Sequence, residues 1–151
     1  LEIPDNLKIN CDLSHWVCVC EKLFDIDDSR DIWWPPVLQA VAKRCHLVHG
    51  RIGHAEGPQV IHPKNTPKEL HAHLSWWNIL WKAQRERGSN SIVVTEHGPE
   101  PYQNYDTPQR RIDQSPLTDD EKSDILWEIN DYVKNQIITA YNTGGGRIEY
   151  K

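Results

Sequence analysis

Short apolar runs alternate with polar residues along the first two thirds of the chain, and three of them end in a possible metal ligand. The runs at 7–11, 46–48 and 92–95 are followed by Asp12, His49 and Glu96. Runs of this length between polar residues are typical of β-strands. The pattern therefore predicts strands over residues 7–12, 45–51 and 91–96, each with a polar group at its C-terminal end.

Alternation within each predicted strand decides which side chains share a face, because successive residues of a strand point to opposite sides. Asn10 and Asp12 share one face of the first strand, opposite Leu7, Ile9 and Cys11. The corresponding sets are Leu47, His49 and Arg51 in the second strand, and Ile92, Val94 and Glu96 in the third.

Two helices are predicted between the first and second strands. Ser14 is a candidate N-cap for a helix over residues 16–24, and residues 25–31 form an acidic loop. The Pro35-Pro36 pair suits the start of a second helix that continues to about Arg44.

The most regular helical pattern covers residues 67–86. Thr66, Pro67 and Glu69 form an N-terminal signature with a capping box. Apolar side chains then recur at helical spacing, at Leu70, Leu74, Trp77 and Trp81. The sequence 88–90, Gly-Ser-Asn, ends this helix.

A last helix is predicted to begin at Thr118 and Glu121, after an irregular, proline-rich stretch over residues 99–116. Its apolar positions are Ile125, Ile129, Tyr132, Val133 and Ile137. We expect residues 1–141 to form one folded segment and residues 142–151 to form a flexible, glycine-rich tail.

Alternating strands and helices predict an α/β fold in which the strands run parallel in the order one, two, three. The C-terminal ends of parallel strands are where α/β proteins assemble their active sites. We therefore expect Asp12, His49 and Glu96 to converge. Their carboxylate and imidazole groups suit a divalent metal ion.

The charge, the apolar runs and the cysteines of the chain argue against several classes of function. The 151 residues carry a formal charge of −5, and their only basic cluster is Arg110-Arg111, so a nucleic-acid partner is not expected. No apolar run reaches the length of a membrane span. The four cysteines lack a metal-binding spacing and are read as free thiols in a cytoplasmic protein, with two disulfides as the alternative.

The segments HGRIGHAEGPQV at 49–60, DLSHW at 12–16 and VTEHGPEPY at 94–102 resemble the last three strand–helix units of xylose isomerase-like TIM barrels, which include sugar phosphate isomerases and epimerases. The resemblance implies a partial (β/α) TIM barrel, the C-terminal half-barrel, with three parallel units that only other chain material can complete. The chain lacks methionine and starts close to a strand, so we expect material upstream of Leu1.

In that family a Glu, an Asp, a His and a second Glu hold a divalent metal. The resemblance implies that Asp12, His49 and Glu96 are the last three ligands, that the first Glu lies upstream, and that the metal is Mn, Mg, Co or Zn. Glu96 would also move a proton at the reacting carbon, and His15 would contact substrate oxygens as a second catalytic group. Arg51, Trp16 and His54 would complete the substrate site.

Simpler readings remain open for each of these residues. Asp12 could be a helix-start or turn residue, and His49 and Glu96 could be ordinary loop residues. His15 could pack at a helix cap, and Arg51 could form a surface salt bridge. Trp16 could stack on a sugar ring or shield the site, and the role of His97 beside Glu96 is undecided.

Two functions follow from the resemblance. The first is the C-terminal part of a metal-dependent sugar or sugar-phosphate isomerase or epimerase, acting through an enediolate and inactive without its N-terminal portion. The second is a non-catalytic half-barrel module that self-associates or docks on a partner subunit. A zinc endonuclease is disfavoured by the acidic balance. In either case we expect the chain to associate through its open sheet edges or its uncovered face.

Overall fold

The computed structural model describes residue 4 and residues 6–105 and 116–144, and it has an α/β fold. The order of its elements is β1 (Ile9–Cys11), α1 (Leu13–Val19), η1 (Ser29–Asp31), α2 (Trp34–Ala42), β2 (Cys45–Gly50), η2 (Pro63–Asn65), α3 (Pro67–Glu86), β3 (Ile92–Thr95) and α5 (Asp119–Asn142). Residues 106–115 of the predicted irregular stretch and residues 145–151 of the predicted tail lie outside the described residues.

The three strands form one parallel sheet in the order β1-β2-β3. The predicted order and direction are therefore confirmed. Leu47 on the central strand pairs with Asn10 on one side and with Ile92 on the other. Within the described ranges this sheet is open and does not close into a barrel.

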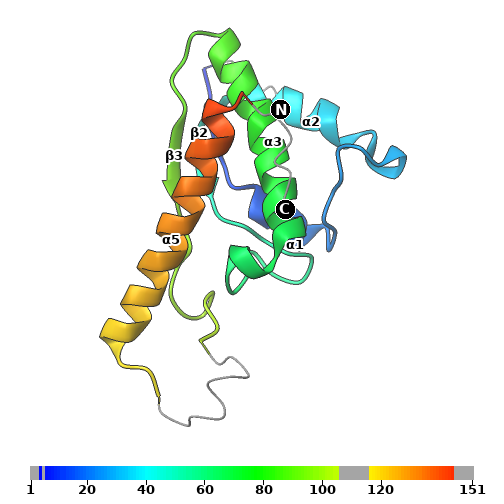
Figure 1. Cartoon of the computed structure of the whole chain (residues 1–151). Helices are drawn as coiled ribbons and strands as arrows, with labels where there is room; N and C mark the ends of the chain where they lie inside the picture. The colour runs from blue at the N-terminus through cyan, green and yellow to red at the C-terminus, as the bar shows by residue number, and fades with distance from the viewer. Residues whose placement is uncertain (1–3, 5, 106–115, 145–151) are drawn as a thin grey trace.

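Helices cover one face of the sheet, where α3 and α5 lie next to each other against the strands (Figure 1). Val48 is fully buried on this covered face. The opposite face is open: Ile92 and Val94 are 58% and 47% exposed. As the alternation predicted, this open face also carries Asn10 and His49.

Tryptophan dominates the core between the helices and the covered face. Trp34, Trp76, Trp77 and Trp81 are fully buried, and the predicted apolar stripe of α3 is buried along its length. Each tryptophan can remove on the order of 150–250 Å² from water. These residues explain how a chain with a modest apolar fraction forms a core.

The first helix was predicted over residues 16–24, but α1 covers Leu13–Val19. Asp12, not Ser14, is the N-cap, because its side chain accepts a hydrogen bond from the Ser14 backbone N–H. The helix stops at Val19 because Glu21 adopts a left-handed conformation, with φ of 50°. The backbone N–H of Lys22 then bonds the Val17 carbonyl, closing the helix without a glycine to signal it.

The predicted starts of the two long helices are capped differently from what the sequence signature of a capping box at Thr66 indicated. At α5 a capping box forms, since Thr118 and Glu121 exchange side-chain and backbone hydrogen bonds. At α3 the Thr66 side chain makes no cap. The chain enters α3 directly from η2, and the Thr66 hydroxyl donates back to the Pro63 carbonyl at 3.5 Å.

Two glycines permit close approaches that bring the site together. A Cβ on Gly50 would lie 2.8 Å from Cδ1 of Ile137 in α5. A Cβ on Gly53 would lie 2.8 Å from the backbone oxygen of Ser14. Gly53 therefore lets the loop after β2 lie directly on the start of α1.

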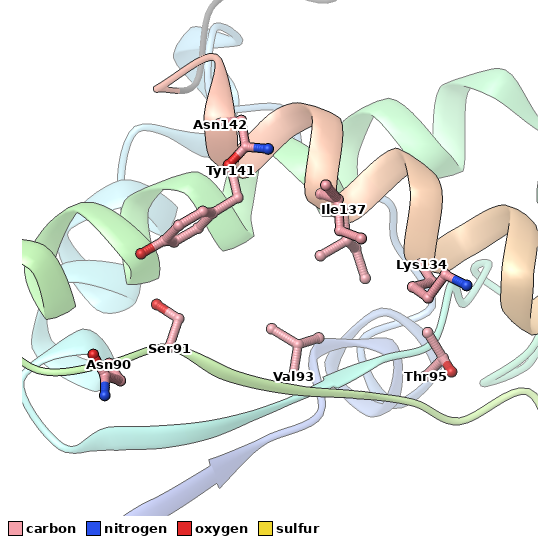
Figure 2. A pocket seen from close by; sticks show the side chains of 9 residues that line it. Asn90, Ser91, Val93, Thr95, Lys134, Ile137, Tyr141 and Asn142 are labelled. Atoms are coloured by element: carbon pink, nitrogen blue, oxygen red, sulfur yellow. The ribbon is translucent and has the colours of Figure 1, made fainter.

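A groove of about 480 Å³ lies between β3 and α5, on the covered side of the sheet. Figure 2 shows Ile137 and Tyr141 of α5 facing Val93 and Ser91 across it. The candidate ligands lie elsewhere, at the C-terminal ends of the strands.

In the part of the chain that is described, no helix is long and apolar enough to cross a membrane. All four cysteines are free thiols.

Candidate metal centre

The three predicted ligands converge. Asp12, His49 and Glu96 each offer one ligand atom, and these atoms all lie within 4.8 Å of one another. The sheet order explains the convergence, because Asp12 directly follows β1, His49 lies near the end of β2 and Glu96 directly follows β3. Neighbouring parallel strands bring these positions into one row.

His49 presents a specific nitrogen to the two carboxylates. Its Nδ1 forms an ion-pair contact with Oε2 of Glu96 and lies 3.7 Å from Oδ2 of Asp12. Its Nε2 lies on the other side of the ring, 2.8 Å from Nδ2 of Asn10. The imidazole therefore bridges the carboxylate pair and an amide on the neighbouring strand.

Asp12 combines a structural role with a place in the site. Its Oδ1 accepts hydrogen bonds from the backbone N–H of Ser14 at 3.1 Å and from the Ser14 hydroxyl at 2.5 Å. Its Oδ2 faces His49 and accepts from Arg51. Burial opposes ionisation, but the Ser14 hydrogen bonds and the Arg51 charge outweigh it and lower the pKa of Asp12. The carboxylate is ionised at neutral pH.

Arg51 points toward the site as the strand alternation predicted, but it is buried and not on the surface. Only 4% of the residue is exposed. Its guanidinium donates to Oδ2 of Asp12 at 2.5 Å and to the Ser14 hydroxyl at 3.1 Å. The Tyr102 ring lies 5.2 Å from the guanidinium carbon. Arg51 thus supports Asp12, and its contact with a substrate stays a prediction.

The other predicted substrate residues, His15, Trp16 and His54, make different kinds of contact. Nε2 of His15 is 3.5 Å from Oδ2 of Asp12, and its side chain is 54% exposed, so it stands at the rim of the site. The Trp16 ring packs on Trp34 with 5.3 Å between centroids. His54 forms a tight turn with Gly57 through paired backbone hydrogen bonds, which shapes the loop after β2.

The end of β3 is fastened by two side-chain amides that the sequence analysis did not single out as clamps. Asn130 of α5 accepts from the His97 N–H at 3.1 Å and donates to the His97 carbonyl at 2.9 Å. Gln59 makes the same two-way contact with Gly98, at 2.9 and 3.0 Å. These clamps fix the backbone directly after Glu96.

His97 itself is not directed to bulk solvent. It is buried, and neither of its ring nitrogens has a hydrogen-bond partner among the residues that the structure describes. Burial, followed by the nearby charge of Arg51, lowers the pKa of His97 to about 3. His97 is therefore a neutral, packed residue at neutral pH.

The residues that were not predicted from the sequence differ in how visible they were there. Asn10 could have been found, because the alternation of the first strand already places it on the same face as Asp12. Tyr102 and Asn130 come from an irregular segment and from a helix distant in sequence. No local pattern links either of them to the site.

The residues present fit a divalent cation. Two carboxylates and one imidazole are suitable donors for a hard or borderline divalent ion, and three protein ligands leave positions for a substrate. Among the described residues, Oε2 of Glu96 has no well-formed hydrogen bond, although it is buried against His49 and lies 4.0 Å from Nη2 of Arg51. A buried carboxylate oxygen in this state is costly unless a cation or donor satisfies it.

No protein-family model, curated protein or solved structure matches the chain. The argument for function therefore rests on the geometry of the site and on the motifs. The likeness to xylose isomerase-like barrels stays a prediction from those motifs.

Proposed function

We propose that this chain is the C-terminal part of a divalent-metal-dependent sugar or sugar-phosphate isomerase or epimerase. The observation that carries the proposal is the convergence of Asp12, His49 and Glu96 within 4.8 Å at the C-terminal ends of adjacent parallel strands. This is the edge of an α/β sheet where catalytic groups assemble.

The three side chains would hold the cation, His15 would orient the substrate and Arg51 would support Asp12. When bound, Mn, Mg, Co or Zn would supply Lewis-acid stabilisation of an enediolate. Glu96 would move a proton at the reacting carbon, since its carboxylate is more exposed than that of Asp12. His15 at the rim would contact substrate oxygens. Arg51 would keep Asp12 in place.

The proposal includes a complementary polypeptide. Three strands cannot enclose a site as eight strands do. Ile92 and Val94 on the open face are exposed here, and the missing strands of a barrel would cover them. The fourth ligand, a glutamate, would come from the same material.

The same exposed face favours a second candidate, a non-catalytic half-barrel that docks on a partner subunit or on itself. Ile92 and Val94 lie next to each other on one face of an edge strand, and such surfaces promote association. Under this alternative the triad would bind metal, or remain a charge cluster, without turnover.

Metal titration followed by a proton-exchange assay separates these functions. Calorimetry with Mn²⁺, Co²⁺ and Zn²⁺ should show binding that His49→Ala and Glu96→Gln weaken at least tenfold. The chain, mixed with the polypeptide that completes the barrel, should exchange substrate C–H protons in D₂O with a panel of ketoses and ketose phosphates. Glu96→Gln should abolish that exchange. Metal binding without exchange on any sugar would support the docking module.

A further inference from the structure

The amide of Asn10 lies in an unexpected place for a strand residue. It sits on the open face of β1, and its Nδ2 is 2.8 Å from Nε2 of His49 on the neighbouring strand. Asparagine is disfavoured in strands because it stabilises turns and caps instead. Its presence at this position therefore calls for a reason other than strand formation.

We propose that Asn10 is a positioning residue that directs Nδ1 of His49 to the metal. The inference rests on the metal site of the proposed function and adds to it the choice of the ligating nitrogen. A single imidazole ring spans Asn10 on one side and the carboxylates of Asp12 and Glu96 on the other. The amide thereby fixes the rotation of the ring.

The chemistry of imidazole makes the amide suitable for both states of the site. Without metal, Nδ1–H faces the Glu96 carboxylate, and Nε2 accepts a hydrogen bond from the Asn10 NH₂ group. A metal ion on Nδ1 requires that nitrogen to be unprotonated, so the ring proton moves to Nε2. A half-turn of the Asn10 amide then offers its Oδ1 as the acceptor for Nε2–H.

The amide of asparagine supplies both a donor and an acceptor at this position. Aspartate could accept from Nε2–H in the metal-bound state but could not donate to Nε2 in the metal-free state. Leucine has nearly the same size and could do neither. Partners of this kind around metal-bound histidines typically account for 10- to 100-fold in metal affinity.

The simpler reading is that Asn10 is a solvated polar residue on an open strand face. In that case its contact with His49 would be incidental, and removing the amide would change nothing at the metal. The variants Asn10→Leu and Asn10→Asp separate the two readings. Asn90→Leu is a matched control, because Asn90 is exposed and lines the groove between β3 and α5, away from the site.

The test measures the dissociation constant of Zn²⁺ by calorimetry and the protonation of each His49 nitrogen by ¹⁵N long-range NMR. In the metal-free wild type, the proton of the neutral ring should reside on Nδ1, and Asn10→Leu should shift it toward a mixture. With Zn²⁺, Nδ1 should be the ligand in the wild type. Asn10→Leu should weaken binding 10- to 100-fold, Asn10→Asp by less than about threefold, and Asn90→Leu not at all.

Each outcome decides the question. Metal binding through Nε2, or unchanged affinity and unchanged protonation in Asn10→Leu, overturns the role of Asn10. Failure of the wild type to bind any divalent ion overturns the metal site itself. In that event the proton position in the metal-free ring still reports whether Asn10 orients His49. Circular dichroism of each variant shows whether the fold is retained.

Discussion

The Nη2 atom of Arg51 lies 2.5 Å from Oδ2 of Asp12 and joins the end of β2 to the start of α1. Both side chains are largely buried, so this contact differs from an ion pair on the surface. The same aspartate caps α1 and faces His49. Removing Arg51 would therefore disturb a helix start and a candidate ligand together.

Arg51→Ala should lower the free energy of unfolding by on the order of 3 kcal/mol, because it leaves the buried Asp12 carboxylate without the guanidinium charge that it pairs with. Urea denaturation followed by tryptophan fluorescence measures this change. Arg30→Ala is the control, since Arg30 pairs with Asp28 while 83% of its side chain is exposed. That control should leave the free energy of unfolding close to that of the wild type, because solvent screens an exposed ion pair. Equal effects would show that Arg51 has no special structural role.

The buried imidazole of His73 should make stability depend on pH. Burial lowers its pKa from 6.5 to about 4. Below pH 6.5 the His73 ring binds a proton in the unfolded chain but stays neutral in the folded chain. The free energy of unfolding therefore falls as the pH decreases toward 4. The slope from this one group is about 1.4 kcal/mol per pH unit.

Denaturation midpoints measured from pH 7 to pH 4 check this dependence. His73→Gln should show a shallower decline over that range, although it is less stable at pH 7 because the ring also accepts from the Gly53 N–H. His46→Gln changes an exposed ring and should keep the slope of the wild type. An unchanged slope in His73→Gln would contradict the prediction.

Gly53→Ala should be more damaging than Gly50→Ala. The added methyl group at position 53 meets the backbone of Ser14, which cannot move without displacing the start of α1. At position 50 the close contact is with the flexible end of Ile137, and the other neighbours lie at an ordinary van der Waals distance of 3.5 Å. We expect a loss of about 1–3 kcal/mol for Gly53→Ala and below about 1 kcal/mol for Gly50→Ala. Thermal unfolding and metal titration of both variants test this, and metal affinity should fall only for Gly53→Ala.

The open face of the sheet should cause the chain to associate. Sedimentation velocity at micromolar concentration should show dimers or larger species, and the double variant Ile92→Lys with Val94→Lys should shift them toward monomer. Val19→Lys serves as the control, because Val19 is 80% exposed at the end of α1 and not on the sheet. A stable wild-type monomer would contradict this expectation and would favour a self-contained fold.

Regular patterns in the sequence were sufficient to predict the frame of the site. Alternation in the strands predicted the faces of Asp12, His49 and Glu96, and the order of strands and helices predicted a parallel sheet in sequential order. Both follow from local geometry and from the handedness of crossovers. The start of the last helix at Thr118 was equally local.

Contacts between distant or irregular segments could not be predicted in this way. Helix α1 ends in a Schellman-type motif in which Glu21 adopts a left-handed conformation. Glycine is the usual residue at such a position, and its absence left the helix end without a sequence signal. Tyr102 reaches Arg51 from a segment without periodicity. Thr66 satisfies a local signature, yet η2 turns its hydroxyl away from the helix. In each case the local sequence pattern does not specify the observed contact.

The Asn130 clamp on His97 links the third ligand to the last helix. Glu96 is held in its place partly by α5, since one of the two amides that clamp the backbone after it belongs to that helix and the other, Gln59, does not. If the triad binds a cation, occupancy of the site and docking of α5 are therefore thermodynamically coupled. A cation that binds the triad would slow the opening of α5, and a partner that displaced α5 would release the cation.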